Sequence, residues 1–213
     1  MKRLLFAIGI AIPALLQAAS AVGFRVADAK GAPVADAVVS LTPLDGPARL
    51  EPPTAPVEIM QRGQEFSPYV TPLVAGTRVS FPNRDTVQHH VYSLSKPKKF
   101  ELPLYAGEAK EAIVFDQPGI VALGCNIHDW MSAYVVVLAT PWFAQTGADG
   151  RAAITGIPPG RYRAEAWHPR LGKVESRELD VSGPPAASVD FTLALKPDRR
   201  LRRVHSAVPG GYK

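Results

Sequence analysis

Three residues that could bind a transition metal lie close together in the chain. Cys125, the single cysteine, is followed by His128 and Met131, so a thiol, an imidazole and a thioether recur at intervals of three residues. Two histidines, one cysteine thiolate and a weak axial methionine form the ligand set of a type 1 copper site. The second histidine must then come from another strand, and the chain offers His89.

A single cysteine also has a simpler interpretation. Cys125 could be buried as a small hydrophobic residue that has no chemical role. In an oxidising compartment, however, an unpaired thiol cannot form an internal disulfide, and an exposed one is open to oxidation. The histidine and methionine that follow it, together with His89, favour metal ligation over the inert interpretation.

The first 21 residues are typical of an export signal. Lys2 and Arg3 precede an apolar run, residues 4–16, that is too short to cross a bilayer. Residues 19–21, Ala-Ser-Ala, supply a cleavage pattern of small residues, so we expect the mature chain to begin at Val22. We expect an exported periplasmic protein, because no later segment is apolar enough to span a membrane.

The rest of the chain has the pattern of an all-β protein. Short runs rich in Val, Ile and aromatic residues alternate with segments that contain most of the 21 prolines and 17 glycines, as strands and turns require. No long segment outside the leader has a helical apolar period. The runs that we expect to form strands cover residues 23–26, 37–41, 57–60, 77–81, 119–123 and 134–138.

Two separated segments suggest one sandwich that is interrupted by another. Residues 26–41 form a strand–Gly turn–strand pattern, and residues 147–162 contain Asp-Gly and Pro-Pro-Gly turns between short strands. These segments resemble the opening and closing parts of the transthyretin-like, carboxypeptidase-regulatory-like β-sandwich. We therefore expect residues 22–45 and 141–195 to form such a sandwich, with a second domain inserted into one of its loops. Two consecutive domains are the alternative, but they would leave the first strands without partners.

The intervening residues, 55–140, resemble the plastocyanin-like and amicyanin-like cupredoxins. The resemblance rests on a strand that ends at residues 79–83 in Val-Ser-Phe-Pro-Asn, a histidine six residues later, and a Phe-Asp-x-Pro-Gly turn at 115–119. It also includes the Cys-x-x-His-x-x-Met spacing and the Val-rich strand that follows. The expected fold is a Greek-key cupredoxin β-sandwich inserted into the outer sandwich.

The resemblance implies specific roles for five residues. His89, Cys125, His128 and Met131 would bind one mononuclear copper ion per chain, and Asn83 would tie the two ligand-bearing loops together. The chain departs from the usual pattern at Ile127, where relatives have a proline, and at His90, where most have an asparagine.

His90 competes with His89 for the fourth ligand position. Adjacent residues on a strand point to opposite faces, so only one of the two can reach the metal. The six-residue offset from Asn83 in the family pattern selects His89. His90 would then be a surface residue or a hydrogen-bonding neighbour of the site.

These features predict a periplasmic type 1 copper protein that carries single electrons between redox partners. One alternative is a copper carrier or sensor that handles the ion itself. Another is a carbohydrate- or protein-binding sandwich with a passenger cupredoxin domain, which would need Trp142, Phe143 and Trp167 to face solvent. We expect no enzymatic activity, because the chain has no second cysteine or histidine cluster and no nucleophile, phosphate-loop or zinc-protease motif.

The net charge of +5 comes from the ends of the chain. Residues 196–213 are rich in Lys and Arg and low in apolar residues, so we expect a disordered basic tail. A basic tail is no argument for nucleic-acid binding by the folded body. We expect a monomer.

Overall fold

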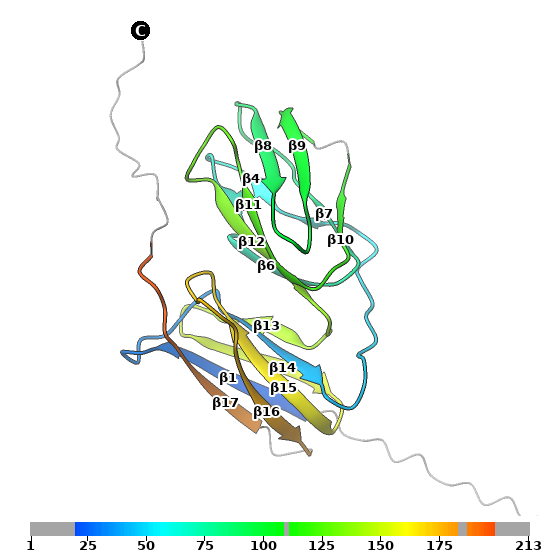
Figure 1. The fold of residues 1–213 in the computed structure, drawn as a ribbon, viewed down its shortest axis with the longest axis vertical. Helices are drawn as coiled ribbons and strands as arrows, with labels where there is room; N and C mark the ends of the chain where they lie inside the picture. The colour runs from blue at the N-terminus through cyan, green and yellow to red at the C-terminus, as the bar shows by residue number, and fades with distance from the viewer. Residues whose placement is uncertain (1–19, 109–110, 183–186, 199–213) are drawn as a thin grey trace, which may run out of the picture.

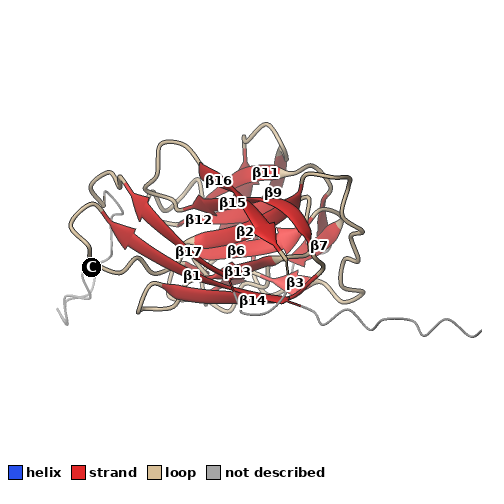
Figure 2. Cartoon of the chain, turned by 90° about the horizontal axis from the view of Figure 1, so that it is seen from below, coloured by secondary structure: helices blue, strands red, loops and turns tan. Residues whose placement is uncertain are grey.

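The computed structural model describes residues 20–108, 111–182 and 187–198. Every regular element in these ranges is a β-strand (Figure 2), so the all-β prediction is confirmed. No helix in the described ranges has the length and apolarity needed to cross a bilayer. The expected leader lies outside the described residues except for Ser20 and Ala21, which begin the first strand.

Two β-sandwiches lie one above the other (Figure 1). The lower sandwich has one sheet of order β14-β1-β17 and another of order β13-β2-β15-β16. β1 is antiparallel to β14 and parallel to β17, and β2 pairs with β13 and β15. The strand bounds are β1 Ser20–Asp28, β2 Val38–Pro43, β13 Phe143–Gln145, β14 Arg151–Ile157, β15 Gly160–Trp167, β16 Glu175–Val181 and β17 Ala187–Leu193.

The upper sandwich is formed by the strands between β2 and β13. A five-stranded sheet of order β6-β12-β11-β8-β9 faces a three-stranded sheet of order β10-β7-β3, and β4 pairs with β5 as a small hairpin. The strand bounds are β3 Val57–Glu58, β4 Met60–Gln61, β5 Phe66–Ser67, β6 Val70–Val74, β7 Thr77–Ser80, β8 His89–Ser93, β9 Phe100–Tyr105, β10 Ile113–Phe115, β11 Gly119–Gly124 and β12 Ser132–Leu138.

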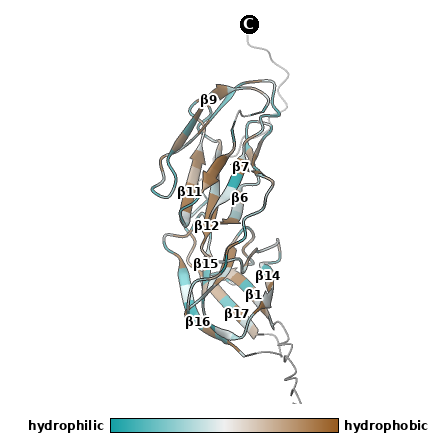
Figure 3. Ribbon diagram, turned by 90° about the vertical axis from the view of Figure 1, so that its right-hand side faces the viewer, coloured by the Kyte–Doolittle hydropathy of each residue, from teal (hydrophilic) through white to brown (hydrophobic). Residues whose placement is uncertain are grey.

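Each sandwich has its own hydrophobic core. Alternate side chains of a strand point to one face, so each strand contributes its apolar face to one of the two cores. β1 buries Val22, Phe24 and Val26 in the lower core, whereas Val79 and Phe115 lie in the upper one. Figure 3 shows apolar residues concentrated on β11 and β12, whereas the edge strand β16 carries hydrophilic residues. The division of the strands between two cores follows the two segments that flank residues 55–140 in the sequence.

A third, smaller cluster joins the two sandwiches. Val38 and Trp167 from the lower half pack against Val70 and Val136 from the upper half. The ring of Tyr134 meets Trp167 edge-on, with centroids 5.6 Å apart. β12 therefore reaches from the upper core to the contact with the lower one.

The two connections between the sandwiches differ. The outgoing connection, residues 45–56, is largely exposed. On the return, Thr140 is fully buried, and its Oγ1 donates a hydrogen bond to the Leu41 carbonyl at 2.6 Å. The N–H of Leu41 in turn donates to the Trp142 carbonyl at 2.8 Å.

Each run that the sequence predicted to form a strand lies on a strand of the structure, although residues 57–60 divide between β3 and β4. The first residues of the expected tail are not disordered. The Lys196 N–H donates to the Arg170 carbonyl at 2.9 Å, and Nε of Arg170 donates to the Lys196 carbonyl at 2.7 Å. Residues 199–213 of that tail lie outside the described residues.

Candidate metal centre

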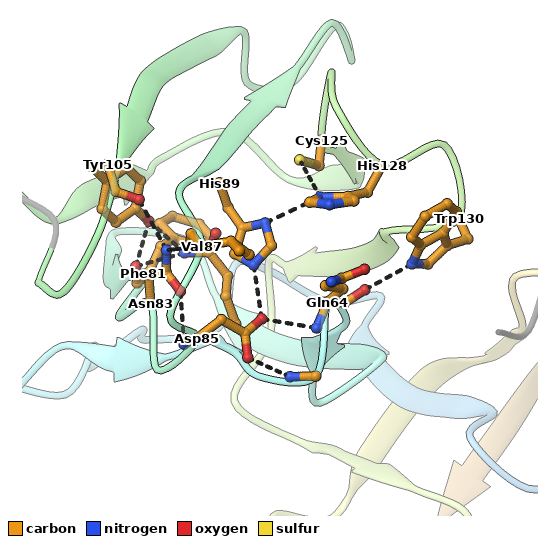
Figure 4. Close-up of polar contacts among 12 residues, drawn as sticks. Gln64, Phe81, Asn83, Asp85, Val87, His89, Tyr105, Cys125, His128 and Trp130 are labelled. Carbon is orange, nitrogen blue, oxygen red and sulfur yellow. Dashed lines mark hydrogen bonds and ion pairs between the residues drawn. The ribbon is translucent and has the colours of Figure 1, made fainter. Parts of the chain in front are cut away.

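Three potential metal ligands converge at one end of the upper sandwich (Figure 4). The ligand atoms of His89, Cys125 and His128 all lie within 4.8 Å of one another. Nδ1 of His89 lies 3.2 Å from Nδ1 of His128, and Sγ of Cys125 lies 3.8 Å from the same His128 nitrogen. Two segments that are far apart in the sequence thus present one sulfur and two ring nitrogens to a common point.

A short loop positions two of the three. Cys125 follows the end of β11, and β12 begins at Ser132, so the chain reverses between them. The Met131 N–H donates to the His128 carbonyl at 2.9 Å, which closes a tight turn over residues 128–131. A loop can direct side chains three residues apart toward one point, whereas a straight strand alternates them between faces.

His89 reaches the cluster from the first position of β8, where it pairs with Tyr105 of β9. Its side chain is fully buried. The adjacent His90 makes a separate contact, with its Nε2 2.8 Å from Oε1 of Glu101. The structure therefore places His89, and not His90, beside Cys125 and His128.

Met131 is buried in the upper core, with 2% of its surface exposed, and belongs to the same cluster as Cys125. The hydrogen bond from its backbone holds it at the end of the turn that begins at His128. Its role as the axial ligand stays a prediction.

Asn83 does not have the expected contacts. Its Nδ2 donates to the carbonyls of Val87 and Tyr105, both at 2.9 Å, and its Oδ1 accepts the Asp85 N–H at 2.9 Å. All of these partners lie in the loop before β8 or at the end of β9. Asn83 thus holds the loop that leads to His89. Among the described residues, none of its hydrogen bonds reaches the loop of Cys125. Two of the three partners, Asp85 and Val87, lie within four positions of Asn83, as is usual for an amide side chain in a turn.

Asp85, which the sequence analysis did not select, contacts the other nitrogen of the His89 ring. Its Oδ2 lies 2.7 Å from Nε2 of His89, and its side chain is 13% exposed. The carboxylate also accepts the N–H groups of Gly63, at 2.6 Å, and Gln64, at 2.8 Å. Burial acts to raise the pKa of Asp85, but the hydrogen bonds from Gln64, His89 and Gly63 outweigh it and hold the pKa below its usual value.

A second polar network lies behind His89. The Tyr105 hydroxyl donates to the Phe81 carbonyl, and Nε2 of the fully buried Gln61 donates to the same carbonyl and to the Tyr105 oxygen. Burial raises the pKa of Tyr105 to about 12, and the negative charges of Glu108 and Cys125 add to the increase. Tyr105 therefore keeps its proton at neutral pH.

The ligand cluster approaches solvent at His128. His89 and Cys125 are buried, whereas His128 is half-buried and the neighbouring Ile127 is 50% exposed. The ring of Trp130 packs on His128 with centroids 5.2 Å apart, and its Nε1 donates to the Gln64 carbonyl at 3.1 Å. These contacts hold the Trp130 ring against the loop that carries His128.

The donor set fits copper. One thiol and two imidazoles with converging nitrogens suit copper better than Mg²⁺ or Ca²⁺, which prefer oxygen ligands. Because a carboxylate only accepts hydrogen bonds, Nε2 of His89 is the donor in this contact, and in the neutral ring Nδ1 then has a lone pair directed at the cluster. The contact with Asp85 therefore leaves His89 in the tautomer that a metal requires.

Comparisons with solved structures give partial likenesses. A copper-containing nitrite reductase from Thermus scotoductus SA-01 is 27% identical over 45% of this chain and 26% of its own, with a TM-score of 0.38. A purple cupredoxin from Nitrosopumilus maritimus is 23% identical over 38% of this chain and 99% of its own, with a TM-score of 0.35. A reduced point mutant of amicyanin is 20% identical over 47% of this chain and 98% of its own, with a TM-score of 0.36.

All three TM-scores are below 0.5. No protein-family model matches the chain. No curated protein matches it either.

Proposed function

We propose that the chain is a type 1 copper protein that carries single electrons. The observation that supports this function is the convergence of His89, Cys125 and His128, whose ligand atoms lie within 4.8 Å of one another. A thiolate with two imidazoles is the equatorial set of such a site, and Met131 would supply the weak axial ligand. Copper, when bound, exchanges one electron between Cu(I) and Cu(II).

The protein contributes a rigid ligand set. His89 is fully buried and hydrogen-bonded to Asp85, and Cys125 and Met131 are part of the packed upper core. Ligands that are fixed before the metal arrives need little movement when an electron is gained or lost. His128 is the half-buried ligand and lies beside the exposed Ile127, so we propose that electrons pass through its edge.

Four ligands leave no open position for a substrate, so we propose a carrier and not an enzyme. We further propose that the protein is exported to the periplasm, acts there as a monomer and exchanges electrons with another redox protein. The two cores support the proposed division of the chain, with residues 55–140 as an inserted copper-binding domain and residues 22–45 and 141–195 as the outer sandwich.

A ligand-binding role for the outer sandwich receives less support. Trp167 is only 9% exposed and packs between the two halves, and Nε1 of Trp142 donates to the Gly156 carbonyl at 3.2 Å. Of the three residues named for an aromatic platform, these two are engaged in packing or hydrogen bonding.

The direct test is to add Cu(II) to the purified protein and to record its visible spectrum. We expect an intense thiolate-to-copper charge-transfer band that is absent from the Cys125→Ser variant and altered in Met131→Leu. His90→Gln, a change in the histidine that lies outside the cluster, is the matched control and should keep the band. A colourless copper complex of the wild type would refute the type 1 site.

Voltammetry then separates a carrier of electrons from a carrier of copper. A reversible one-electron wave with the metal retained is the result that our proposal requires. Loss of the metal to a competing apo-protein during redox cycling would favour the copper carrier instead.

A further inference from the structure

The turn between β4 and β5 contacts both segments that carry the potential metal ligands. Gly63 and Gln64 donate their backbone N–H groups to Asp85, which in turn binds His89. The Gln64 carbonyl accepts the indole N–H of Trp130, which lies between His128 and Met131. One pair of residues thus touches both sides of the site (Figure 4).

This turn has an unusual backbone. Arg62 and Glu65 exchange backbone hydrogen bonds at 3.0 and 3.3 Å across it, as in a two-residue hairpin. Gly63 has φ of +66° and Gln64 has φ of +59°, which is the combination of a type I′ turn. Glycine adopts this conformation readily, but a residue with a Cβ does so only where the surroundings enforce it.

On one side the turn fixes His89. Its two N–H groups hold both oxygens of Asp85, and Oδ2 then accepts the proton of His89 Nε2. A carboxylate that orients a ligating histidine through its second nitrogen sets both the tautomer and the direction of the ring. Nδ1 of His89 is thereby directed at His128, 3.2 Å away.

On the other side the turn fixes the loop of Cys125. The hydrogen bond from Trp130 to Gln64 spans 66 positions of the sequence. The Trp130 ring packs on His128 at 5.2 Å between centroids, and the backbone bond from Met131 to His128 closes the turn around it. A shift of Gln64 would therefore move both the carboxylate behind His89 and the indole beside His128.

We propose that the Gly63–Gln64 turn is a positioning element that sets the separation of the two ligand-bearing segments. It has the role that the sequence analysis gave to Asn83. The proposal rests on the proposed copper function in so far as the ligands bind copper, but the positioning itself is a property of the metal-free protein.

A double-mutant cycle on Asp85→Asn and Trp130→Phe tests this coupling. The dissociation constant for Cu(II) is measured by competition with a chelator, and Asp116→Asn, a change in an exposed carboxylate 3.4 Å from Lys98, is the control. We expect Asp85→Asn to weaken binding about 10- to 100-fold. We expect Trp130→Phe to weaken it about fivefold, the value of one hydrogen bond. The loss of copper affinity in the double variant should be smaller than the product of the two single losses, because both substitutions act through one turn.

A pair of variants tests the turn without removing the backbone groups that form its hydrogen bonds to Asp85 and Trp130. Gly63→Ala places a Cβ where no atom lies within 4 Å, so it disturbs only the backbone conformation. Gln64→Gly keeps the N–H and carbonyl groups and removes the unfavourable conformation. We expect weaker copper binding for Gly63→Ala and wild-type binding for Gln64→Gly.

Nitrogen NMR of the metal-free protein distinguishes failure of this proposal from failure of the copper function. We expect His89 to carry its proton on Nε2 in the wild type and in Asp116→Asn, and to lose this preference in Asp85→Asn. This result would support the positioning role even in a protein that shows no charge-transfer band. The proposal would be overturned if the loss of copper affinity in the double variant equalled the product of the losses in the two single variants. It would also be overturned if the tautomer of His89 did not change in Asp85→Asn.

Discussion

Gly150→Ala should destabilise the lower sandwich strongly, because the glycine is enclosed by backbone. Gly150 has φ of +70°, and a Cβ there would overlap the Val26 carbonyl oxygen and lie 3.0 Å from the Val34 nitrogen. The left-handed conformation alone costs about 1–2 kcal/mol for alanine. Relief of the overlap must also disturb the hydrogen bonds from Val26 to Gly150 and from Val34 to Val26, each of which contributes about 1 kcal/mol. We expect a total loss of about 3–4 kcal/mol.

Gly156→Ala is the matched control. Gly156 has nearly the same φ, +72°, but no atom lies within 4 Å of the position of its Cβ. It should cost only the conformational term, about 1–2 kcal/mol. The assay is urea unfolding followed by tryptophan fluorescence, with the copper band of the native protein as a separate readout. The band should be unchanged in both variants, because neither glycine belongs to the upper sandwich. Equal losses for the two variants would refute the steric argument.

Three further predictions concern the upper sandwich. First, stability should fall as the pH rises from about 10 to about 12, because folded Tyr105, with a pKa of about 12, keeps a proton that the unfolded chain releases. The effect is below about 2 kcal/mol, since the ring is partly exposed, and urea midpoints of Tyr105→Phe should lack this part of the slope. Second, Phe115→Ala should cost about 3–5 kcal/mol in urea unfolding, because the ring is fully buried against Phe100; Val114→Ala, at a side chain that is 42% exposed, should cost under about 0.5 kcal/mol. A similar loss for both would contradict the assigned core. Third, copper at about 100 times its dissociation constant should add about 2.7 kcal/mol of stability, measured as a rise in Tm that is absent from Cys125→Ser.

Two of the predicted strands have sequences that indicate a buried face. β1 and β12 have apolar residues at alternate positions or in a Val-rich run, and both were expected. β9 was not, because it lies at the edge of its sheet, contains Pro103 and leaves much of its surface exposed. An edge strand has less to bury, so its sequence carries a weaker pattern.

The ligand cluster could be predicted from residue type and spacing, but its supports could not. Cys125 and His128 are rare residues at a distinctive interval, whereas the contact of Asp85 with His89 depends on how a loop folds over four residues. The contribution of Gln64 comes entirely from its backbone N–H and carbonyl groups. Its positive φ is also uncommon for glutamine. Nothing in the side chain of Gln64 signals a role near a metal.

The interrupted strand order has a consequence for synthesis. β1 and β2 leave the ribosome first, yet their partners β13, β14, β15 and β17 all follow the whole upper sandwich. Domains generally fold as units as they emerge. The half that carries His89 and Cys125 can therefore complete its core before the strands that pair with β1 and β2 have been synthesised.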